Sequence, residues 1–170
     1  AYPTGTVRLV VPFAAGSMTD ILSRALAEKL TATWGQQVLV ENKPGLPGTA
    51  SVAKATPDGA TLIVTSNGLT VLKAINKDLS FDPIADFAPI TKIAVIPLVM
   101  VAPPDSPAKS LKELVAAVKE KPGQMTYSAV GLGSATGIAS VQFLEQAGLK
   151  MNMLSHKGTP DLHTAIVRGD

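Results

Sequence analysis

Two short loops carry the residues whose types and spacing point to anion binding. Residues 14–20 (AAGSMTD) and 128–137 (SAVGLGSATG) each follow an apolar run, are rich in Gly, Ala and hydroxyl residues, and lead into a stretch of helical period. Such a loop exposes backbone N–H groups at the positive end of a helix, where an anion is held without a charged side chain. Two loops of this kind facing each other would clasp a dicarboxylate. The competing interpretation is that small residues at these turns only permit tight packing.

Polar residues near these loops leave two interpretations open. Asp20 lies in the expected first helical turn, where helix capping accounts for it as well as a contact with a ligand amine or hydroxyl. Ser66 and Asn67 follow a third apolar run. Polar groups at the carboxyl ends of parallel strands are where α/β folds bind ligands, and a plain turn is equally consistent with this pair.

The motifs of nucleotide-binding enzymes are missing from the chain. Gly131 and Gly133 are followed by Thr136 where a dinucleotide-binding G-x-G-x-x-G needs its third glycine, and no G-K-[ST] of a P-loop occurs. We therefore expect no cofactor.

The sequence also lacks the motifs of a serine nucleophile and of a metal site. Ser17 and Ser134 do not lie in a G-x-S-x-G turn, and the two histidines, His156 and His163, lack metal-ligand spacing. We expect both histidines at the surface, no metal and no catalytic residue. An α/β enzyme acting on a carboxylate or acyl substrate, with Ser134 or Asp20 as its reactive group, is the alternative to a binding protein.

Length and charge narrow the function classes. The chain has 170 residues, 15 Lys plus Arg, 13 Asp plus Glu, a net charge of +2 and no cysteine. This balance provides no basic surface for nucleic acid, and no apolar run reaches the roughly 18 residues of a membrane helix. The start at Ala1, without Met or an apolar leader, is what an exported chain looks like after its signal peptide is removed, although a trimmed chain would look the same.

Apolar runs of strand length alternate with helical periods, which is typical of βαβ units with mainly parallel sheets. Strands are predicted at 7–13, 37–42, 61–66, 125–130 and 151–154, with one or two more within 90–102; helices are predicted from 19 to the glycine at 35, at 49–55, 69–75, 111–120, from the second loop to 146, and at 161–167. Residues 77–89 receive no element.

The proline-rich residues 103–107 are the most linker-like segment. They divide the chain into a first α/β lobe (1–102), a hinge (103–107) and a second α/β lobe (108–170). The last predicted helix has no closing strand, so we expect both lobes to be incomplete and a continuation to be missing. Unpaired sheet edges would then favour self-association of the truncated chain.

Several motifs in a fixed order carry a family resemblance. They are residues 12–16 (PFAAG) with Thr19 and Asp20, 40–45 (VENKPG), 57–59 (PDG), 86–89 (DFAP), 122–124 (PGQ), Gly133 with Ser134, and Lys157 with Gly158. With them the chain resembles the extracytoplasmic solute receptors of tripartite tricarboxylate transporters, also called Bug receptors. The resemblance runs over nearly the whole chain, which matches only the first part of a family member.

The resemblance implies a type II periplasmic-binding-protein fold and a function. Two α/β lobes would close on a small carboxylate in the periplasm and deliver it to the membrane subunits of a tripartite transporter, without enzymatic activity. The ligand-binding residues carried over from the family are Phe13, Ala14, Gly16, Ser17, Thr19, Asp20, Ser66 and Asn67 from the first lobe, and Ser128, Gly133, Ser134 and Thr136 from the second. Two departures from the family pattern are Gly137, where His is common, and His156, where an aromatic residue is common.

Overall fold

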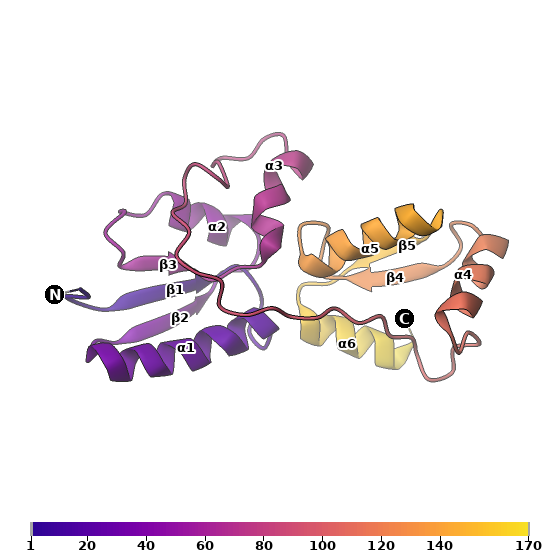
Figure 1. The fold of residues 1–170 in the computed structure, drawn as a ribbon, viewed down its shortest axis with the longest axis horizontal. Helices are drawn as coiled ribbons and strands as arrows, with labels where there is room; N and C mark the ends of the chain where they lie inside the picture. Colours follow the sequence, from indigo (N-terminus) through magenta and orange to yellow (C-terminus); the bar gives the residue numbers. More distant parts are fainter. Residues whose placement is uncertain (1, 170) are drawn as a thin grey trace. The chain divides into compact units, whose positions relative to one another are not determined.

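The computed structural model describes residues 2–169. They fall into two compact units, the first made of the residues up to 88 with 157–159, the second of 89–156 with the residues from 160 onward. Each unit combines helices with its own parallel sheet, as the alternating pattern predicts (Figure 1). The predicted hinge at 103–107 lies inside the second unit and stays a prediction.

The sheet of the first unit has three parallel strands in the order β2-β1-β3. The strands are β1 (Val7–Val11), β2 (Val38–Asn42) and β3 (Thr61–Ile63). β1 is the central strand and is almost entirely buried, as its β-branched sequence predicts. It ends where Pro12 removes a backbone donor, so the predicted strand to residue 13 is two residues too long.

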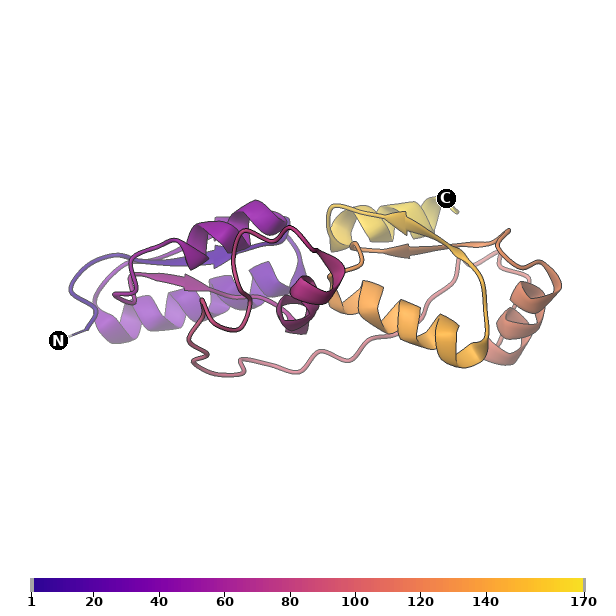
Figure 2. The same ribbon diagram turned by 90° about the horizontal axis from the view of Figure 1, so that it is seen from above.

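Two helices cover opposite faces of this sheet. α1 (Met18–Trp34) connects β1 to β2, and α2 (Leu46–Ala53) connects β2 to β3 on the other side of β1. The chain crosses the sheet in one direction from β1 to β2 and in the opposite direction from β2 to β3, and both crossovers have the same handedness. The two helices therefore lie on different faces of the sheet, as Figures 1 and 2 together show. The predicted start of α2 at residue 49 is wrong, since Pro47 lies in its first turn, where proline is favourable.

The core of the first unit lies between β1 and α1. Its buried members are aliphatic and are packed against partly buried hydrophobic residues: Val7, Leu9, Val11, Ala27, Val38 and Val64, with Phe13, Leu26, Leu30, Trp34, Val40 and Leu62 around them. This core holds the carboxyl end of β1, and therefore the first loop, in place.

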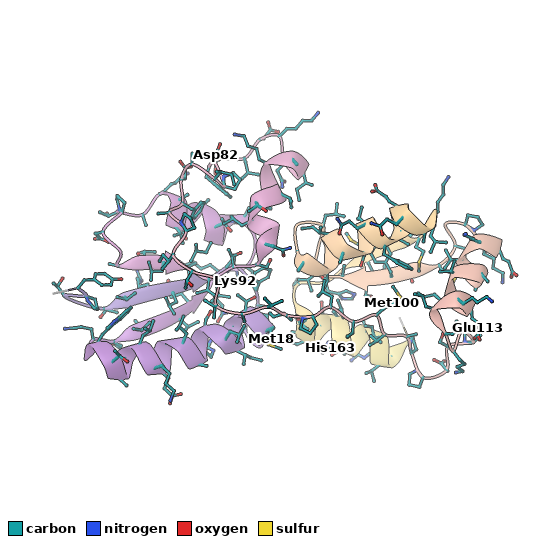
Figure 3. All side chains as sticks on the ribbon, viewed as in Figure 1. Met18, Asp82, Lys92, Met100, Glu113 and His163 are labelled. Carbon is teal, nitrogen blue, oxygen red and sulfur yellow. The ribbon has the colours of Figure 1, made fainter. Side chains whose placement is uncertain are left out.

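The rest of the first unit is less regular. A 3-10 turn η1 (Asn67–Val71) and the short α3 (Leu72–Ile75) occupy the segment predicted as helical. Residues 77–89 contain no helix or strand, as expected. Lys73 Nζ and Asp82 Oδ2, 2.5 Å apart, attach this segment to α3 (Asp82 is labelled in Figure 3).

The second unit has a two-stranded parallel sheet, β4 (Thr126–Ala129) with β5 (Asn152–Ser155). Its helices are α4 (Leu111–Glu120), α5 (Ala135–Ala147) and nearly all of α6 (Thr159–Arg168). α4 has the predicted bounds. The buried hydrophobic residues of this unit, among those described, are few: Val118, Ala129, Leu149, Leu162 and Ala165.

The predicted strands within residues 90–102 are not formed. The segment is extended but pairs with no other strand of the described chain, and every residue in it is exposed. No helix within residues 2–169 has the length and apolar character needed to cross a membrane.

Candidate ligand-binding site

The first loop joins β1 to α1 through a tight turn. The N–H of Ser17 donates to the carbonyl of Ala14 at 3.2 Å, and Gly16 between them adopts φ 79°, a left-handed conformation that favours glycine. Ser17 is then the N-cap of α1, since its Oγ accepts from the N–H of Asp20 at 3.3 Å.

The second loop repeats this construction in the other unit. The N–H of Ser134 donates to the carbonyl of Gly131 at 3.3 Å, and Gly131 has φ 76°. Ser134 caps α5 by accepting from the N–H of Gly137 at 3.0 Å. Its Oγ also donates to Gly131 O at 2.9 Å and lies 2.8 Å from Oγ1 of Thr136, so this buried hydroxyl is fully engaged.

Both loops leave backbone donors free at the first helical turn. Within residues 2–169, the N–H groups of Met18 and Thr19 in α1 make no hydrogen bond, nor do those of Ala135 and Thr136 in α5. Unused N–H groups at the start of a helix carry partial positive charge and attract an anion. The geometry of each loop by itself therefore provides the donors that the sequence analysis predicted.

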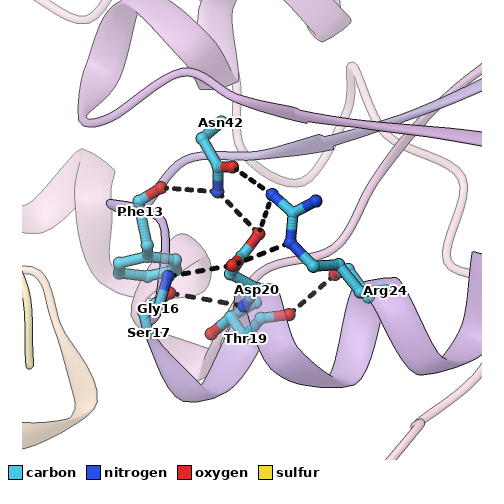
Figure 4. A network of polar contacts seen from close by, with 8 residues as sticks. Phe13, Gly16, Ser17, Thr19, Asp20, Arg24 and Asn42 are labelled. Carbon is cyan, nitrogen blue, oxygen red and sulfur yellow. Dashed lines mark hydrogen bonds and ion pairs between the residues drawn. The ribbon is translucent and has the colours of Figure 1, made fainter.

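Asp20 is the centre of a buried network behind the first loop (Figure 4). Its Oδ2 accepts from the N–H of Gly16 at 2.9 Å and from Nε of Arg24 at 3.1 Å. Its Oδ1 accepts from Nδ2 of Asn42 at 3.0 Å and lies 3.0 Å from Nη2 of Arg24. Asn42 Nδ2 also donates to the carbonyl of Phe13 at 3.2 Å, so the network ties the end of β2 to the loop.

The electrostatics of Asp20 follow from these contacts. Burial acts to raise the pKa of its carboxyl, but the hydrogen bonds from Arg24, Gly16 and Asn42 and the charge of Arg24 outweigh it, and the pKa is lowered. The carboxylate therefore stays ionised while it is only 2% exposed. In this arrangement both of its oxygens are used to hold the loop.

The remaining predicted residues lie near the carboxyl ends of the strands in their own unit. Ser66 caps η1 by accepting from the N–H of Gly68 at 3.4 Å, and Asn67 beside it is exposed. Ser128 lies in β4, and Gly133 immediately precedes the cap of α5. The structure thus groups eight of the predicted residues in the first unit and four in the second.

Sequence reasoning missed His156. Its side chain is only 12% exposed, its Nε2 lies 3.0 Å from Oγ of Ser128, and its Nδ1 lies 3.4 Å from Oδ2 of Asp161. The expectation that it lies at the surface is wrong, because the parallel register of β4 and β5 brings it next to Ser128. His163 is exposed, as expected.

Arg24 and Asn42 were also missed as partners of Asp20. Arg24 follows Asp20 by four residues on α1, a spacing that places the two side chains together. Among residues 2–169, no three His, Cys, Asp or Glu side chains gather as metal ligands would.

Comparison with known proteins places the chain in a family. Residues 22–169 match the family model described as "Tripartite tricarboxylate transporter family receptor". The chain belongs to this receptor family. Among the curated relatives of this chain is the protein BugT of Bordetella pertussis. It is 32% identical over 178 residues, and the match covers 99% of this chain and 55% of BugT.

Solved structures agree with this membership. MatC from Rhodopseudomonas palustris with bound malate superposes with a TM-score of 0.90 and 30% identity, covering 99% of this chain and 58% of MatC. A second R. palustris protein, solved with adipate, gives a TM-score of 0.93 at 28% identity with the same coverages. The periplasmic-binding-protein fold is therefore confirmed, and the relatives are solute-binding receptors rather than enzymes. The chain spans about half the length of the curated relatives it matches.

Proposed function

We propose that this chain acts as a periplasmic receptor for a small carboxylate. Its family membership supports a receptor, and structural neighbours that hold malate and adipate support carboxylates as the ligand class. The observation that carries the proposal is the pair of matching loops, each with a serine cap and free N–H groups in the first helical turn.

Neutral donors suffice for such a ligand. Hydrogen bonds to a charged group are about twice as strong as neutral ones, and the helix dipole adds to the attraction of an anion. The balanced net charge of +2 is compatible with this mode, because binding then needs no basic patch.

Two kinds of role divide the proposed residues. Those that present backbone donors or accessible polar groups would contact the ligand: Phe13, Ala14, Thr19, Ser66, Asn67, Ser128, Gly133 and Thr136. The other four would act mainly by shaping the loops: Gly16, Ser17, Asp20 and Ser134. The polar side chains of the last three make hydrogen bonds within the chain, and Gly16 forms the turn through its positive φ.

Proline substitution at the first helical position tests the donors directly. Met18→Pro and Ala135→Pro each remove one backbone N–H, while proline at this position is compatible with a helix. The preceding Ser17 and Ser134 are already extended, as the residue before a proline requires. If the N–H groups hold the carboxylate, isothermal titration with malate, adipate and citrate should show affinity lowered about 10–100-fold in either variant.

Two controls separate this effect from others. Leu111→Pro makes the same change at the first position of α4, which the proposal assigns no ligand, and should bind like the unchanged chain. Met18→Ala removes the side chain and keeps the N–H, so its affinity should also be retained. If no acid in the panel gives heat or raises the melting temperature of the unchanged chain, the carboxylate proposal is wrong.

Delivery to a tripartite membrane transporter is the second part of the proposal and is supported by the family description. Membrane vesicles that contain the transporter subunits should take up labelled carboxylate only when the receptor chain is added. Uptake that is equally fast without the chain would contradict this role.

We also propose that the 170-residue chain self-associates. The sheets of both units end in unpaired strands within residues 2–169, and open edges are templates for pairing with another chain.

A further inference from the structure

Ser128 lies near the carboxyl end of β4, close to the second loop. The first turn of α5 packs against the same end of the strand, since the backbone N–H of Val130 donates to Oγ1 of Thr136 at 3.2 Å. Ser128 is only partly buried. We therefore expect a substituent beside a carboxylate held at the N–H groups of α5 to contact this hydroxyl.

The hydroxyl of Ser128 has one hydrogen-bonding partner within residues 2–169. That partner is Nε2 of His156, 3.0 Å from Oγ. A serine hydroxyl has one proton to donate and two lone pairs that accept. If the proton points to Nε2, only lone pairs remain for a ligand, so the direction of this contact determines what Ser128 can offer.

Strand pairing holds His156 beside Ser128. The backbone N–H of His156 donates to the carbonyl of Ala129 at 2.9 Å, which continues the parallel pairing of β5 with β4. Ala129 is fully buried, and the side chain of His156 is only 12% exposed. The imidazole is therefore part of the packed edge of the sheet.

The second ring nitrogen determines where the imidazole proton lies. Nδ1 of His156 lies 3.4 Å from Oδ2 of Asp161 in α6. In a neutral imidazole one nitrogen carries the proton and the other has a lone pair. A proton on Nδ1 is attracted to the carboxylate, whereas a lone pair in its place would be repelled. Nε2 is then the acceptor, and the hydroxyl of Ser128 donates to it.

We infer that His156 fixes the hydroxyl of Ser128 as a hydrogen-bond acceptor toward the ligand, so that the receptor prefers carboxylates with a hydroxyl to those with a keto group at the same carbon. A ligand hydroxyl can donate to a lone pair of Ser128, but a keto oxygen has only lone pairs and would face them. His156 is thus a positioning residue, which acts through Ser128. The inference rests on the proposed carboxylate-receptor function.

Paired acids test the preference. Malate with oxaloacetate, and α-hydroxyglutarate with α-ketoglutarate, differ only in the hydroxyl or keto group. Isothermal titration of the chain is made at about pH 8, above the range in which an ordinary imidazole takes up a proton. The hydroxy acid of a pair should bind at least about 3-fold more tightly, which is the effect of one net hydrogen bond.

His156→Phe keeps an aromatic ring and removes the acceptor. The proton of Ser128 can then turn to the ligand and donate to a keto oxygen, so the ratio of the two affinities should fall about 3-fold, toward equal binding. A purely structural role would weaken both acids alike and leave the ratio unchanged. His163→Phe is the matched control, because His163 is exposed on α6 (labelled in Figure 3), and it should keep the ratio.

Ser128→Ala shows whether His156 acts through Ser128. This variant should lose the preference as well. His156→Phe added to it should change the ratio no further, because the two substitutions interrupt the same hydrogen bonds. A further fall of the ratio in the double variant would overturn the inference.

The direction of the contact can also be measured without a ligand. The chain has two histidines, so His163→Phe leaves a single imidazole whose nitrogen resonances are unambiguous. Nuclear magnetic resonance of the isotope-labelled ring at the same pH should show a proton on Nδ1 and none on Nε2. A proton on Nε2, or on both nitrogens, overturns the inference.

The results separate the preference from the function on which it rests. If the unchanged chain binds none of these acids and none of the panel above, the receptor proposal fails together with this inference. Three results overturn the inference alone: binding of adipate without either hydroxy acid, a preference for the keto acids, or an unchanged ratio in His156→Phe.

Discussion

Nε2 of His156 lies 3.0 Å from Oγ of Ser128 and joins the carboxyl ends of β4 and β5. The register of the two strands places Ser128 opposite Leu154, two residues before His156. On the other side of the ring, Nδ1 lies 3.4 Å from Oδ2 of Asp161. The imidazole is thus held from both sides within the second unit, next to residues proposed to bind a ligand.

This arrangement gives a first prediction about stability. Replacing His156 with Ala removes a nearly buried ring and leaves Ser128 without its partner, so we expect the free energy of unfolding to fall by about 1–2 kcal/mol. Urea denaturation followed by circular dichroism measures it. The matched substitution His163→Ala, at an exposed position of α6, should change stability by less than about 0.5 kcal/mol. Equal effects of the two would show that the contact with Ser128 contributes nothing.

A second prediction concerns catalytic turnover. The side chains of Ser128, His156 and Asp161 contact one another in the sequence Ser–His–Asp, as the members of a hydrolase triad do. Ser128 lies within an extended strand, not in the sharp strand-to-helix turn that presents a nucleophile, and Asp161 has a 61% exposed side chain. We expect the chain to cleave p-nitrophenyl acetate no faster than the Ser128→Ala variant does. A rate that is clearly lost in Ser128→Ala would instead support the enzyme alternative.

The two groups first considered for that alternative are both engaged within the chain. Ser134 donates to Gly131 O, and the carboxylate of Asp20 accepts from Gly16, Asn42 and Arg24. Neither side chain is available to attack a substrate in this conformation.

Asp20 gives a third prediction, about pH. Its pKa in the folded state is lowered below the unfolded value of about 3.9, so its contribution to stability is complete above that value and is lost as the pH falls through the lower, folded-state pKa. In Asp20→Asn this contribution is absent at all pH values. We expect a loss of about 1–3 kcal/mol at pH 7 and a smaller difference from the unchanged chain below pH 3.

The control for Asp20 is an exposed carboxylate. Asp105→Asn, in the proline-rich segment, should follow the stability of the unchanged chain throughout the pH series. If the stability of Asp20→Asn also equals that of the unchanged chain at every pH, the network behind the first loop does not stabilise the fold. Because Asp20 fixes Gly16, the substitution should in addition weaken carboxylate binding.

A fourth prediction concerns Gly137, where the direction of the stability change on substitution by alanine tests how the second loop packs. Glycine to alanine within a helix normally stabilises by about 0.5–1 kcal/mol. At Gly137 a Cβ would lie 2.1 Å from the carbonyl oxygen of Gly131, a backbone atom that cannot move away without deforming the second loop. We therefore expect Gly137→Ala to destabilise the chain by about 2–4 kcal/mol.

Thermal unfolding checks this prediction. Gly5→Ala is the neutral comparison, because a Cβ there meets nothing within 4 Å. A raised melting temperature in Gly137→Ala would contradict the close packing of the loop on α5. The same lack of space makes the histidine that the family resemblance places at this position incompatible with the loop as it is folded here.

Local signals explain which elements could be predicted. The bounds of α4 were predicted correctly because Ser110 caps the helix and the glycine at 123 follows its end, and both signals lie in the sequence next to the helix. The start of α2 was not, because it depends on a long-range contact: the N–H of Gly45, just before the helix, donates to the carbonyl of Pro12.

The candidate site divides in the same way. The serine caps and small-residue loops were visible in the sequence, since they are local. The contact of Asp20 with Asn42 joins residues 22 apart, and that of Ser128 with His156 joins residues 28 apart, so both depend on strand register. Residues 90–102 have the composition of a strand, but composition does not supply the neighbouring strand that would make them one.

The N–H groups without a hydrogen bond at the start of α1 and α5 belong to the main chain, and this limits which mutations can remove them during evolution. An N–H group is present whichever of the nineteen residues other than proline stands at position 18 or 135, so ordinary substitution cannot delete it. Only a change in backbone path can. Side chains around the loops can therefore diversify without loss of these backbone donors, which are inherited with the fold itself.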